Sequence, residues 1–186
     1  MKDYPGTLFL VVGNSGSGKD SIISGAMEQY PSNLKKIYTP RRYITRPPSE
    51  TEENIPVTQK EFNELAKEGK FALKWHIYGL NYGVPIKIDS LLSEGHPIVV
   101  NVSRTIIPDA RKLYKNLKVI FIRVPLETTI ERIKERGREH GKRLEERIER
   151  AKLYQDFPDA DYIIDNTGSL EDAVQNFLQY IRTHIE

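Results

Sequence analysis

The residues from Gly13 to Lys19 follow the pattern G-x-x-x-x-G-K, in which the four variable positions are Asn14, Ser15, Gly16 and Ser17. The five apolar residues before them, Leu8–Val12, form a run too short for a helix and predict a buried strand. After them, apolar residues recur at helical spacing up to about Gln29. A chance Gly/Ser turn before a lysine is the alternative. A strand and a helix on either side favour a loop whose N–H groups bind phosphate.

We therefore predict a nucleotide-phosphate site in which Lys19 contacts the outer phosphates of ATP as a point charge. The residues expected to form it are Gly13, Asn14, Ser15, Gly16, Ser17, Gly18, Lys19, Asp20 and Ser21.

Asp20 departs from the pattern, because a hydroxyl residue that holds Mg²⁺ is expected directly after the lysine. Ser21 supplies that hydroxyl one place too late. One interpretation is a degenerate and inactive loop. The other is a variant loop in which the Asp20 carboxylate supports the metal, since carboxylate oxygen is a good ligand for Mg²⁺. Asp20 is accordingly the predicted metal ligand.

Composition limits the function classes. The chain has 186 residues, enough for one domain with a sizeable core. Its 28 Lys+Arg and 26 Asp+Glu give a net charge of +2, too balanced for general nucleic-acid binding. The absence of cysteine excludes disulfides and thiolate metal sites and is typical of a cytoplasmic enzyme. Since no apolar run is long enough for a membrane span, we expect small-molecule substrates and neither a membrane nor a nucleic-acid partner.

Strand and helix patterns alternate along the chain, which predicts an α/β fold with a mostly parallel sheet and helices on both faces. Further buried strands are expected at Pro97–Val102 and Lys118–Val124, and one more short strand at Asp161–Asp165. Ser169 is expected to cap a last helix. The apolar face of that helix is predicted to consist of Leu170, Ala173, Val174, Phe177, Leu178 and Ile181.

Residues 34–84 look like an insertion into a single domain whose core comprises residues 1–33 and 85–186. We expect this insertion over the carboxyl edge of the sheet, where such sheets bind ligands. Thr58 and Glu61 form a capping-box signature for a short helix, and Phe71–Val84 predicts short strands. Pro85 is expected to begin the next helix.

The segment Glu131–Lys152 is highly charged, with nine basic and six acidic residues. A solvated helix laced with charge pairs explains such a run. The functional alternative is a mobile lid over about residues 136–150 that brings arginines onto phosphates. Arg132 and Arg136 share a helical face, while Arg138 lies between Gly137 and Gly141, in a bendable stretch.

Further motifs add a family resemblance over nearly the whole length. They are Tyr43-Ile44-Thr45-Arg46, Trp75-His76, Gly79-Leu80-x-Tyr82-Gly83, Asn101-x-Ser103-Arg104 and Arg136-Gly137-Arg138-Glu139. With them, the chain resembles the guanylate kinase superfamily of P-loop kinases, and most closely the ribose 1,5-bisphosphate phosphokinases. That family transfers the γ-phosphate of ATP to ribose 1,5-bisphosphate and forms 5-phosphoribosyl 1-diphosphate. It also carries Asp after the loop lysine, so Asp20 fits the resemblance.

The chain lacks the residues with which guanylate kinases read guanine or support the metal. The resemblance places a carboxylate in the segment matching Ala72–Trp75, where this chain offers Lys74. It places a hydroxyl residue at Val84, and aspartates at the strand end that carries Asn101 and Ser103. Losing such hydrogen bonds costs about 10⁴-fold in discrimination or more. We therefore expect a guanine nucleotide to be a poor acceptor.

The phosphate-binding residues of the family are retained. The resemblance implies that Arg42, Arg46 and Tyr82 hold the acceptor phosphate. It places Arg132, Arg136 and Arg147 around the transferred phosphate, and makes Arg104 and Arg138 extra cations of the ribose-bisphosphate group.

Each of these roles has a structural alternative. Arg42 and Arg46 are also consistent with surface cations that pair with Glu50–Glu53, Trp75 with a core residue, and His76 with a turn-stabilising one. Asn101 and Ser103 either contact acceptor hydroxyls or a metal-bound water, or cap the next helix.

Two other functions stay open. They are a guanylate or other nucleoside monophosphate kinase, and a non-catalytic binding module related to guanylate kinase. The intact Gly13, Gly18 and Lys19 favour an enzyme.

Overall fold

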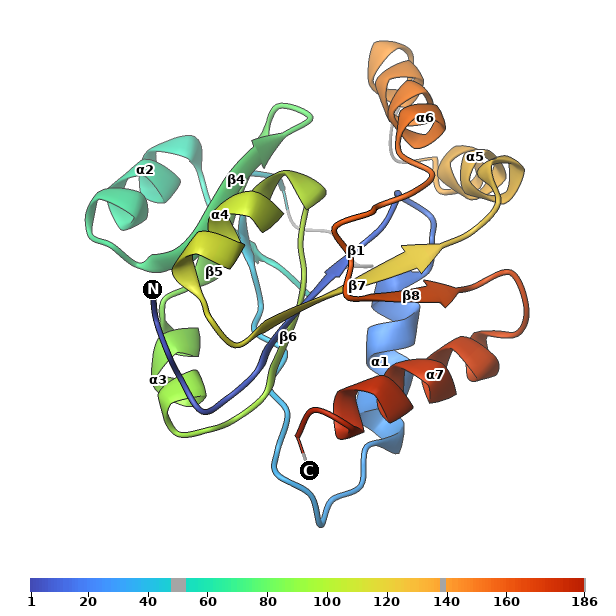
Figure 1. Cartoon of the computed structure of the whole chain (residues 1–186). Coiled ribbons are helices and arrows are strands. Elements are labelled where there is room, and N and C mark those ends of the chain that lie inside the picture. Colours follow the sequence, from blue (N-terminus) through green and yellow to red (C-terminus); the bar gives the residue numbers. More distant parts are fainter. Residues whose placement is uncertain (48–52, 138–139, 186) are drawn as a thin grey trace. The chain divides into compact units, whose positions relative to one another are not determined.

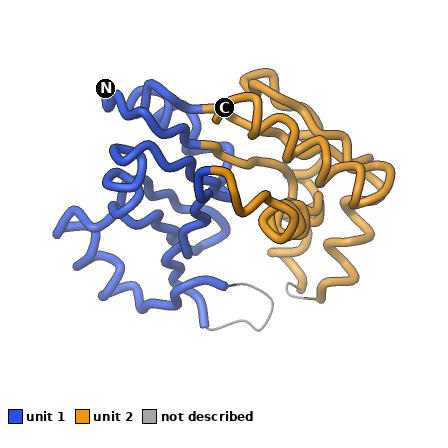
Figure 2. Tube along the Cα trace, turned by 90° about the horizontal axis from the view of Figure 1, so that it is seen from below, with its two compact units in different colours: residues 1–8, 35–117 blue, residues 9–34, 118–186 orange. Residues whose placement is uncertain are grey.

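The computed structural model of the chain describes residues 1–47, 53–137 and 140–185 (Figure 1). The chain divides into two compact units: unit 1 comprises residues 1–8 and 35–117, and unit 2 comprises residues 9–34 and 118–186 (Figure 2). Arg138, one of the predicted lid residues, lies outside the described residues. No helix in the described part of the chain is long and apolar enough to cross a membrane.

Unit 2 contains a sheet in the order β1-β7-β8, and its helices flank the sheet (Figure 1). The strands are β1 (Leu8–Val12), β7 (Leu117–Arg123) and β8 (Tyr162–Asp165), of which the first two begin with a residue of unit 1. The helices are α1 (Lys19–Gln29), α5 (Leu126–Glu135), α6 (Lys142–Leu153) and α7 (Leu170–Arg182). Every residue of β1 is fully buried, which confirms the predicted strand.

Two close contacts fix the carboxyl edge of this sheet and the helices beside it. β7 and β8 pair in parallel, with Arg123 opposite Asp165 at their carboxyl ends. α1 packs against α7 (Figure 1), and Gly25 permits this approach because a Cβ there would lie 2.9 Å from Val174 Cγ2.

The last helix begins as predicted, because the Ser169 hydroxyl accepts a hydrogen bond from the Asp172 amide at 3.1 Å. Its buried residues are Ala173, Val174, Phe177, Leu178 and Ile181. The expectation for Leu170 is wrong: it is the first residue of the helix and remains 47% exposed. The apolar face therefore starts almost one turn later.

Unit 1 contains a second sheet in the order β3-β2-β5-β4. Its strands are β2 (Tyr43–Ile44), β3 (Ile55–Pro56), β4 (Phe71–Ile77) and β5 (Leu80–Pro85). A further strand of this unit is β6 (Ile98–Asn101), in which the Ile98 amide donates to the Thr7 carbonyl at 3.0 Å. The helices are α2 (Gln59–Lys67), α3 (Lys87–Ser93), the 3₁₀ turn η1 (Arg104–Ile106) and α4 (Ile107–Leu113).

The short strands and the capping box predicted in this unit are confirmed. The Glu61 amide donates to Thr58 Oγ1 at 3.2 Å, and the Thr58 amide donates to the Glu61 carboxylate at 2.7 Å. The expectation that Pro85 begins a helix is wrong. Pro85 ends β5 opposite Phe71, a strand end where its missing N–H is tolerated, and α3 begins at Lys87.

Candidate active-site residues

At two positions of the loop between β1 and α1, the backbone adopts a conformation that favours glycine. Gly16 (φ +79°) and Gly18 (φ +91°) lie in the left-handed region. A Cβ at Gly16 would lie 2.9 Å from Arg132 Cβ, and one at Gly18 would lie 2.5 Å from Asn166 Nδ2. Gly16 and Gly18 are therefore required both for the turn and for the close approach of neighbouring side chains.

Side-chain donors engage the carbonyl oxygens of this loop. Lys19 Nζ donates to Gly13 O at 2.8 Å and to Asn14 O at 2.9 Å. Arg132 Nη1 donates to Gly16 O at 3.0 Å, and Asn166 Nδ2 donates to Ser17 O at 2.9 Å. In a planar trans peptide the C=O and the following N–H point in opposite directions. The Ser17 carbonyl points toward Asn166, so the Gly18 amide that follows it points away from Asn166, and this leaves the Gly18 N–H available to an anion.

Two of the predicted arginines of unit 2, Arg132 and Arg147, contact this loop. Arg132, on α5, contacts Gly16, and Arg147 Nη1, on α6, donates to the Ser15 hydroxyl at 2.6 Å. Arg136 caps the C-terminus of α5 and is exposed. The break between α5 and α6 is confirmed, with positive φ at Gly137 (+59°) and Gly141 (+56°).

Asp20 lies in the first turn of α1, directly after the loop lysine, and is exposed. Among the described residues, no group of three or more His, Cys, Asp or Glu side chains is placed to hold a metal. Mg²⁺ usually takes one or two protein carboxylates and completes its shell with water and substrate phosphates. A single carboxylate beside a phosphate loop therefore fits Mg²⁺.

Three of the predicted acceptor residues come together in unit 1. Arg42 Nη1 donates to the Asn101 main-chain oxygen at 2.8 Å, and its guanidinium carbon lies 5.8 Å from the centre of the Tyr82 ring. The Tyr82 ring stacks in parallel on Trp75 at 5.2 Å. Trp75 is buried, as its core interpretation predicted, and it fixes the orientation of Tyr82.

Arg46 follows a segment that two hydrogen bonds tie to β5. The Asn81 amide donates to Thr45 Oγ1 at 2.8 Å, and the Thr45 amide donates to Asn81 O at 3.1 Å. His76 Nδ1 lies 3.1 Å from Asn81 Oδ1 on the paired strand, a contact consistent with the turn-stabilising interpretation.

The capping role of Ser103 is confirmed by its side chain, which accepts a hydrogen bond from the Thr105 amide at the start of η1. Arg104 is half-buried in the same turn.

The comparisons with known proteins agree with this geometry. A sequence model of the family described as guanylate kinase matches residues 6–184. The chain belongs to the guanylate kinase family. A guanylate kinase structure from Anaplasma phagocytophilum superimposes with a TM-score of 0.71 at 17% identity, covering 98% of this chain and 87% of that one. The predicted α/β fold of a P-loop kinase is thus confirmed.

Two relatives of this guanylate kinase family member are named ribose 1,5-bisphosphate phosphokinase PhnN. The protein from Methylobacterium radiotolerans is 35% identical over 96% of this chain and 98% of its own length. The protein from Enterobacter lignolyticus is 38% identical over 96% of this chain and 93% of its own length. The resemblance predicted from the sequence motifs is therefore confirmed.

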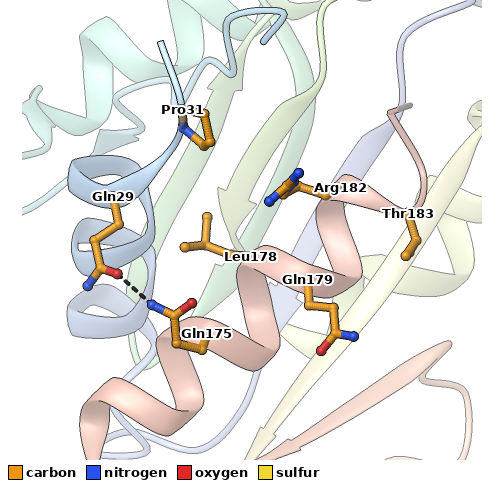
Figure 3. Close-up of a pocket in the computed structure, with 7 residues that line it drawn as sticks. All are labelled: Gln29, Pro31, Gln175, Leu178, Gln179, Arg182 and Thr183. Carbon is orange, nitrogen blue, oxygen red and sulfur yellow. Dashed lines mark hydrogen bonds between the residues drawn. The ribbon is translucent and has the colours of Figure 1, made fainter. Parts of the chain in front are cut away.

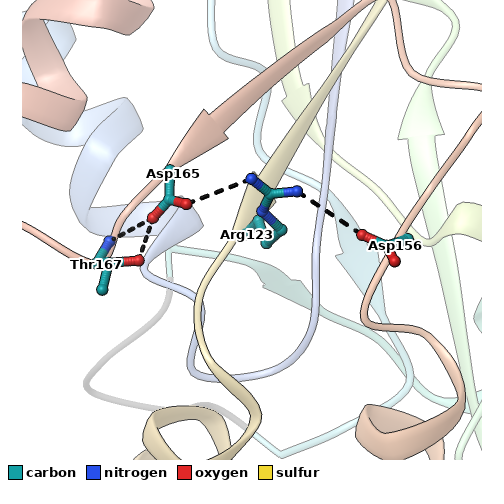
Figure 4. Close-up of polar contacts among 4 residues, drawn as sticks. All are labelled: Arg123, Asp156, Asp165 and Thr167. Carbon is teal, nitrogen blue, oxygen red and sulfur yellow. Dashed lines mark hydrogen bonds and ion pairs between the residues drawn. The ribbon is translucent and has the colours of Figure 1, made fainter.

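The sequence analysis missed Asn166, although a signal was available. Asn166 directly follows β8, and polar residues at the carboxyl ends of parallel strands lie at the ligand-binding edge. Its neighbours form a polar cluster with the end of β7 (Figure 4). Arg123 lies 3.4 Å from the Asp165 carboxylate and 3.8 Å from that of Asp156, while Asp165 also accepts hydrogen bonds from the Thr167 hydroxyl and amide.

A pocket of about 470 Å³ lies at the other end of α1, against α7 (Figure 3). The residues that line it are Gln29, Pro31, Gln175, Leu178, Gln179, Arg182 and Thr183. Gln175 Nε2 donates to Gln29 Oε1 at 2.6 Å and to the Glu171 carboxylate at 2.7 Å. These amides are engaged with each other, and none of the lining residues belongs to the phosphate loop.

The Asp165 cluster generates a pH prediction. The Thr167 hydroxyl holds the pKa of the Asp165 carboxyl below its usual value, helped by the Thr167 amide and Arg123 and opposed by partial burial. A lowered pKa stabilises the fold above the unfolded-state pKa of about 3.9, and this contribution is lost as the pH falls through the folded-state value. Thr167→Val should therefore lower the free energy of unfolding at neutral pH, with a difference that shrinks in acid.

Urea denaturation over a series of pH values measures this difference. Ser93→Ala is the matched control, because the exposed Ser93 hydroxyl donates to the Ser90 main-chain carbonyl at 2.7 Å, and this carbonyl does not titrate. If the loss in the free energy of unfolding caused by Thr167→Val does not change with pH, as expected for the control, the Thr167 hydroxyl does not act through the Asp165 carboxylate.

Proposed function

We propose that this chain uses ATP to phosphorylate ribose 1,5-bisphosphate, forming 5-phosphoribosyl 1-diphosphate. The observation that carries the proposal is the composition of the acceptor side in unit 1. Arg42 donates a hydrogen bond to Asn101 O and lies over the Tyr82 ring. Lys74 and Val84 occupy positions where guanylate kinases carry groups that bind the guanine base. Cations without base-reading groups suit an acceptor with two phosphates and no base. The names of the two relatives support the same substrate.

The reaction needs no general base from the protein. A phosphate monoester has its second pKa near about 6, so the 1-phosphate of the acceptor is already an anionic nucleophile at neutral pH. One of its oxygens forms a bond to the γ-phosphorus of ATP while the bond from that phosphorus to the β,γ-bridging oxygen breaks, and ADP leaves with that electron pair. What catalysis requires is in-line positioning and neutralisation of crowded negative charge.

The residues of unit 2 would supply this charge on the ATP side. Loop amides such as that of Gly18 bind phosphate oxygens, and Lys19 moves from the Gly13 and Asn14 carbonyls onto the outer phosphates. Arg132, Arg136 and Arg147 then neutralise the transferred group. Mg²⁺, when bound, supplies further positive charge on the phosphates, and Asp20 is the residue of this chain that would hold it.

The residues of unit 1 would hold the acceptor. Arg42, Arg46 and Tyr82 bind one phosphate, and Arg104 adds a further cation. Asn101 and Ser103 are the proposed partners of the sugar hydroxyls. The Ser103 oxygen accepts the capping hydrogen bonds from Thr105, and its O–H proton is the group proposed to bind the sugar. We assign the lid role to about residues 136–150, with Arg138 among its cations, because closure over ATP excludes water and suppresses hydrolysis. A cytoplasmic location belongs to the same proposal.

A second candidate is phosphorylation of GMP, which the guanylate kinase family match favours. The acceptors discriminate between the two. With ribose 1,5-bisphosphate, GMP and AMP offered separately, we expect ADP formation from ATP to be far faster with the sugar bisphosphate, by about 10⁴-fold in kcat/KM over GMP if the missing hydrogen bonds act together. Efficient turnover of GMP without turnover of the sugar would contradict the proposal.

Asp20 provides a test of the metal role. Guanylate kinases carry carboxylates at the strand end where this chain has Asn101 and Ser103, so we propose that the metal-supporting carboxylate has moved to the loop. Asp20→Asn should weaken the response to Mg²⁺ and lower kcat substantially, with a small change in the acceptor KM. Asp20→Ser should not restore activity, because the strand-end carboxylates remain absent.

A Mg²⁺ titration of the initial rate measures both variants. Glu28→Gln, which removes an exposed carboxylate from the far end of the same helix, is the matched control. Wild-type kcat and metal response in either Asp20 variant would show that Asp20 is a tolerated substitution.

A further inference from the structure

We propose that Asn166 is a positioning residue for phosphate binding: its carboxamide fixes the Ser17–Gly18 peptide so that the Gly18 N–H faces the anion. This inference rests on the proposed use of ATP but not on the identity of the acceptor. Asn166 is assigned no contact with ATP itself. It acts through the backbone of the loop.

Asn166 is anchored by its main chain and by its side chain. Its main-chain amide donates to Arg123 O at 2.8 Å, and Nδ2 donates to Ser17 O at 2.9 Å. The residue is only 5% exposed, so the second hydrogen bond is shielded from water. Nδ2 also packs against Gly18, since a Cβ there would approach it to 2.5 Å. The amide group thus contacts both residues of the peptide that it orients.

The Ser17–Gly18 peptide needs such a restraint because glycine follows it. Gly18 has φ +91°, a conformation that glycine adopts without steric cost, but the same freedom lets the peptide rotate. A rotated peptide would present the Ser17 carbonyl oxygen to the phosphates and remove the Gly18 N–H from them. A hydrogen bond from Asn166 to that oxygen favours the orientation that binds an anion.

The cluster at the strand ends holds Asn166 in place (Figure 4). Asp165 precedes it and accepts hydrogen bonds from Thr167, which follows it. The main-chain carbonyl of Arg123 accepts a hydrogen bond from the Asn166 amide, and the Arg123 guanidinium lies 3.4 Å from the Asp165 carboxylate. The backbone on both sides of Asn166 is therefore fixed before ATP binds, and little side-chain entropy is lost in orienting the loop.

An uncharged amide suits this role better than a cation. Lys19 and Arg132 also engage loop carbonyls, but both are positive and are proposed to move onto phosphate. The carboxamide of Asn166 carries no charge, so an arriving phosphate attracts it far less than a cation. Asn166 therefore keeps the loop oriented while its charged neighbours change partners.

The test is ATP affinity, measured by calorimetry without any acceptor, in Asn166→Ala and Asn166→Asp. We expect the alanine variant to bind ATP about 10-fold more weakly, as for loss of one buried hydrogen bond. Asn166→Asp keeps the size of the side chain but replaces the donor with an acceptor, so it should bind more weakly still. In turnover assays, the KM for ATP should rise while the acceptor KM stays unchanged.

Asn116→Ala is the matched control. Asn116 Nδ2 donates to the main-chain carbonyls of Gly6 (3.3 Å) and Pro5 (3.4 Å) in unit 1, so its loss should lower the melting temperature without changing the affinity for ATP. Wild-type ATP affinity in a folded Asn166 variant would overturn the inference and leave the proposed function intact. A different pair of results would overturn the proposed function alone. In that case the Asn166 variants bind ATP more weakly than the wild type, but the wild-type protein phosphorylates none of the acceptors.

Discussion

The structure of the phosphate loop depends on donors that engage its carbonyl oxygens. Lys19, Arg132 and Asn166 hold the carbonyls of Gly13, Asn14, Gly16 and Ser17. A loop rich in glycine has many accessible conformations, and most of them would present oxygen as well as N–H to an anion. The donors come from α1, from α5 and from the residue after β8, so the sheet and its helices must form before the loop becomes a phosphate site.

The two units divide the chemistry by the kind of group that they present. In unit 2, main-chain amides and the cations Lys19, Arg132 and Arg147, which contact the loop, suit the phosphates of ATP, whose charge changes during transfer. In unit 1, Arg42 is already fixed on Asn101 O and beside Tyr82, which in turn stacks on buried Trp75. Arg42 is proposed to hold a phosphate of the acceptor, whereas Arg132 and Arg147 lie at the loop proposed to hold ATP and are assigned to the transferred group. This difference separates the proposed binding role of Arg42 from the proposed transition-state roles of Arg132 and Arg147.

The sequence predicted those elements that local patterns determine. β1 follows from five consecutive apolar residues, and the first turns of α2 and α7 follow from Thr58 and Ser169, whose side chains bind amides three residues away. Pro85 and Leu170 were misplaced because a strand end and an exposed first turn depend on what packs beside them. The contacts between Arg42 and Asn101, 59 residues apart, and between Asn166 and Ser17, 149 residues apart, depend on strand pairing that no local pattern encodes.

The central claim is that the engaged carbonyls turn loop amides toward the anion, and amide NMR tests it most directly. In a ¹H–¹⁵N titration of the wild-type protein with ATP, the amide protons of Ser15 and Gly18 should move downfield and saturate together, because each follows an engaged carbonyl and acquires a charged acceptor. Saturable binding of ATP that leaves both amides unchanged would contradict the account, since the phosphates would then be held without the loop backbone.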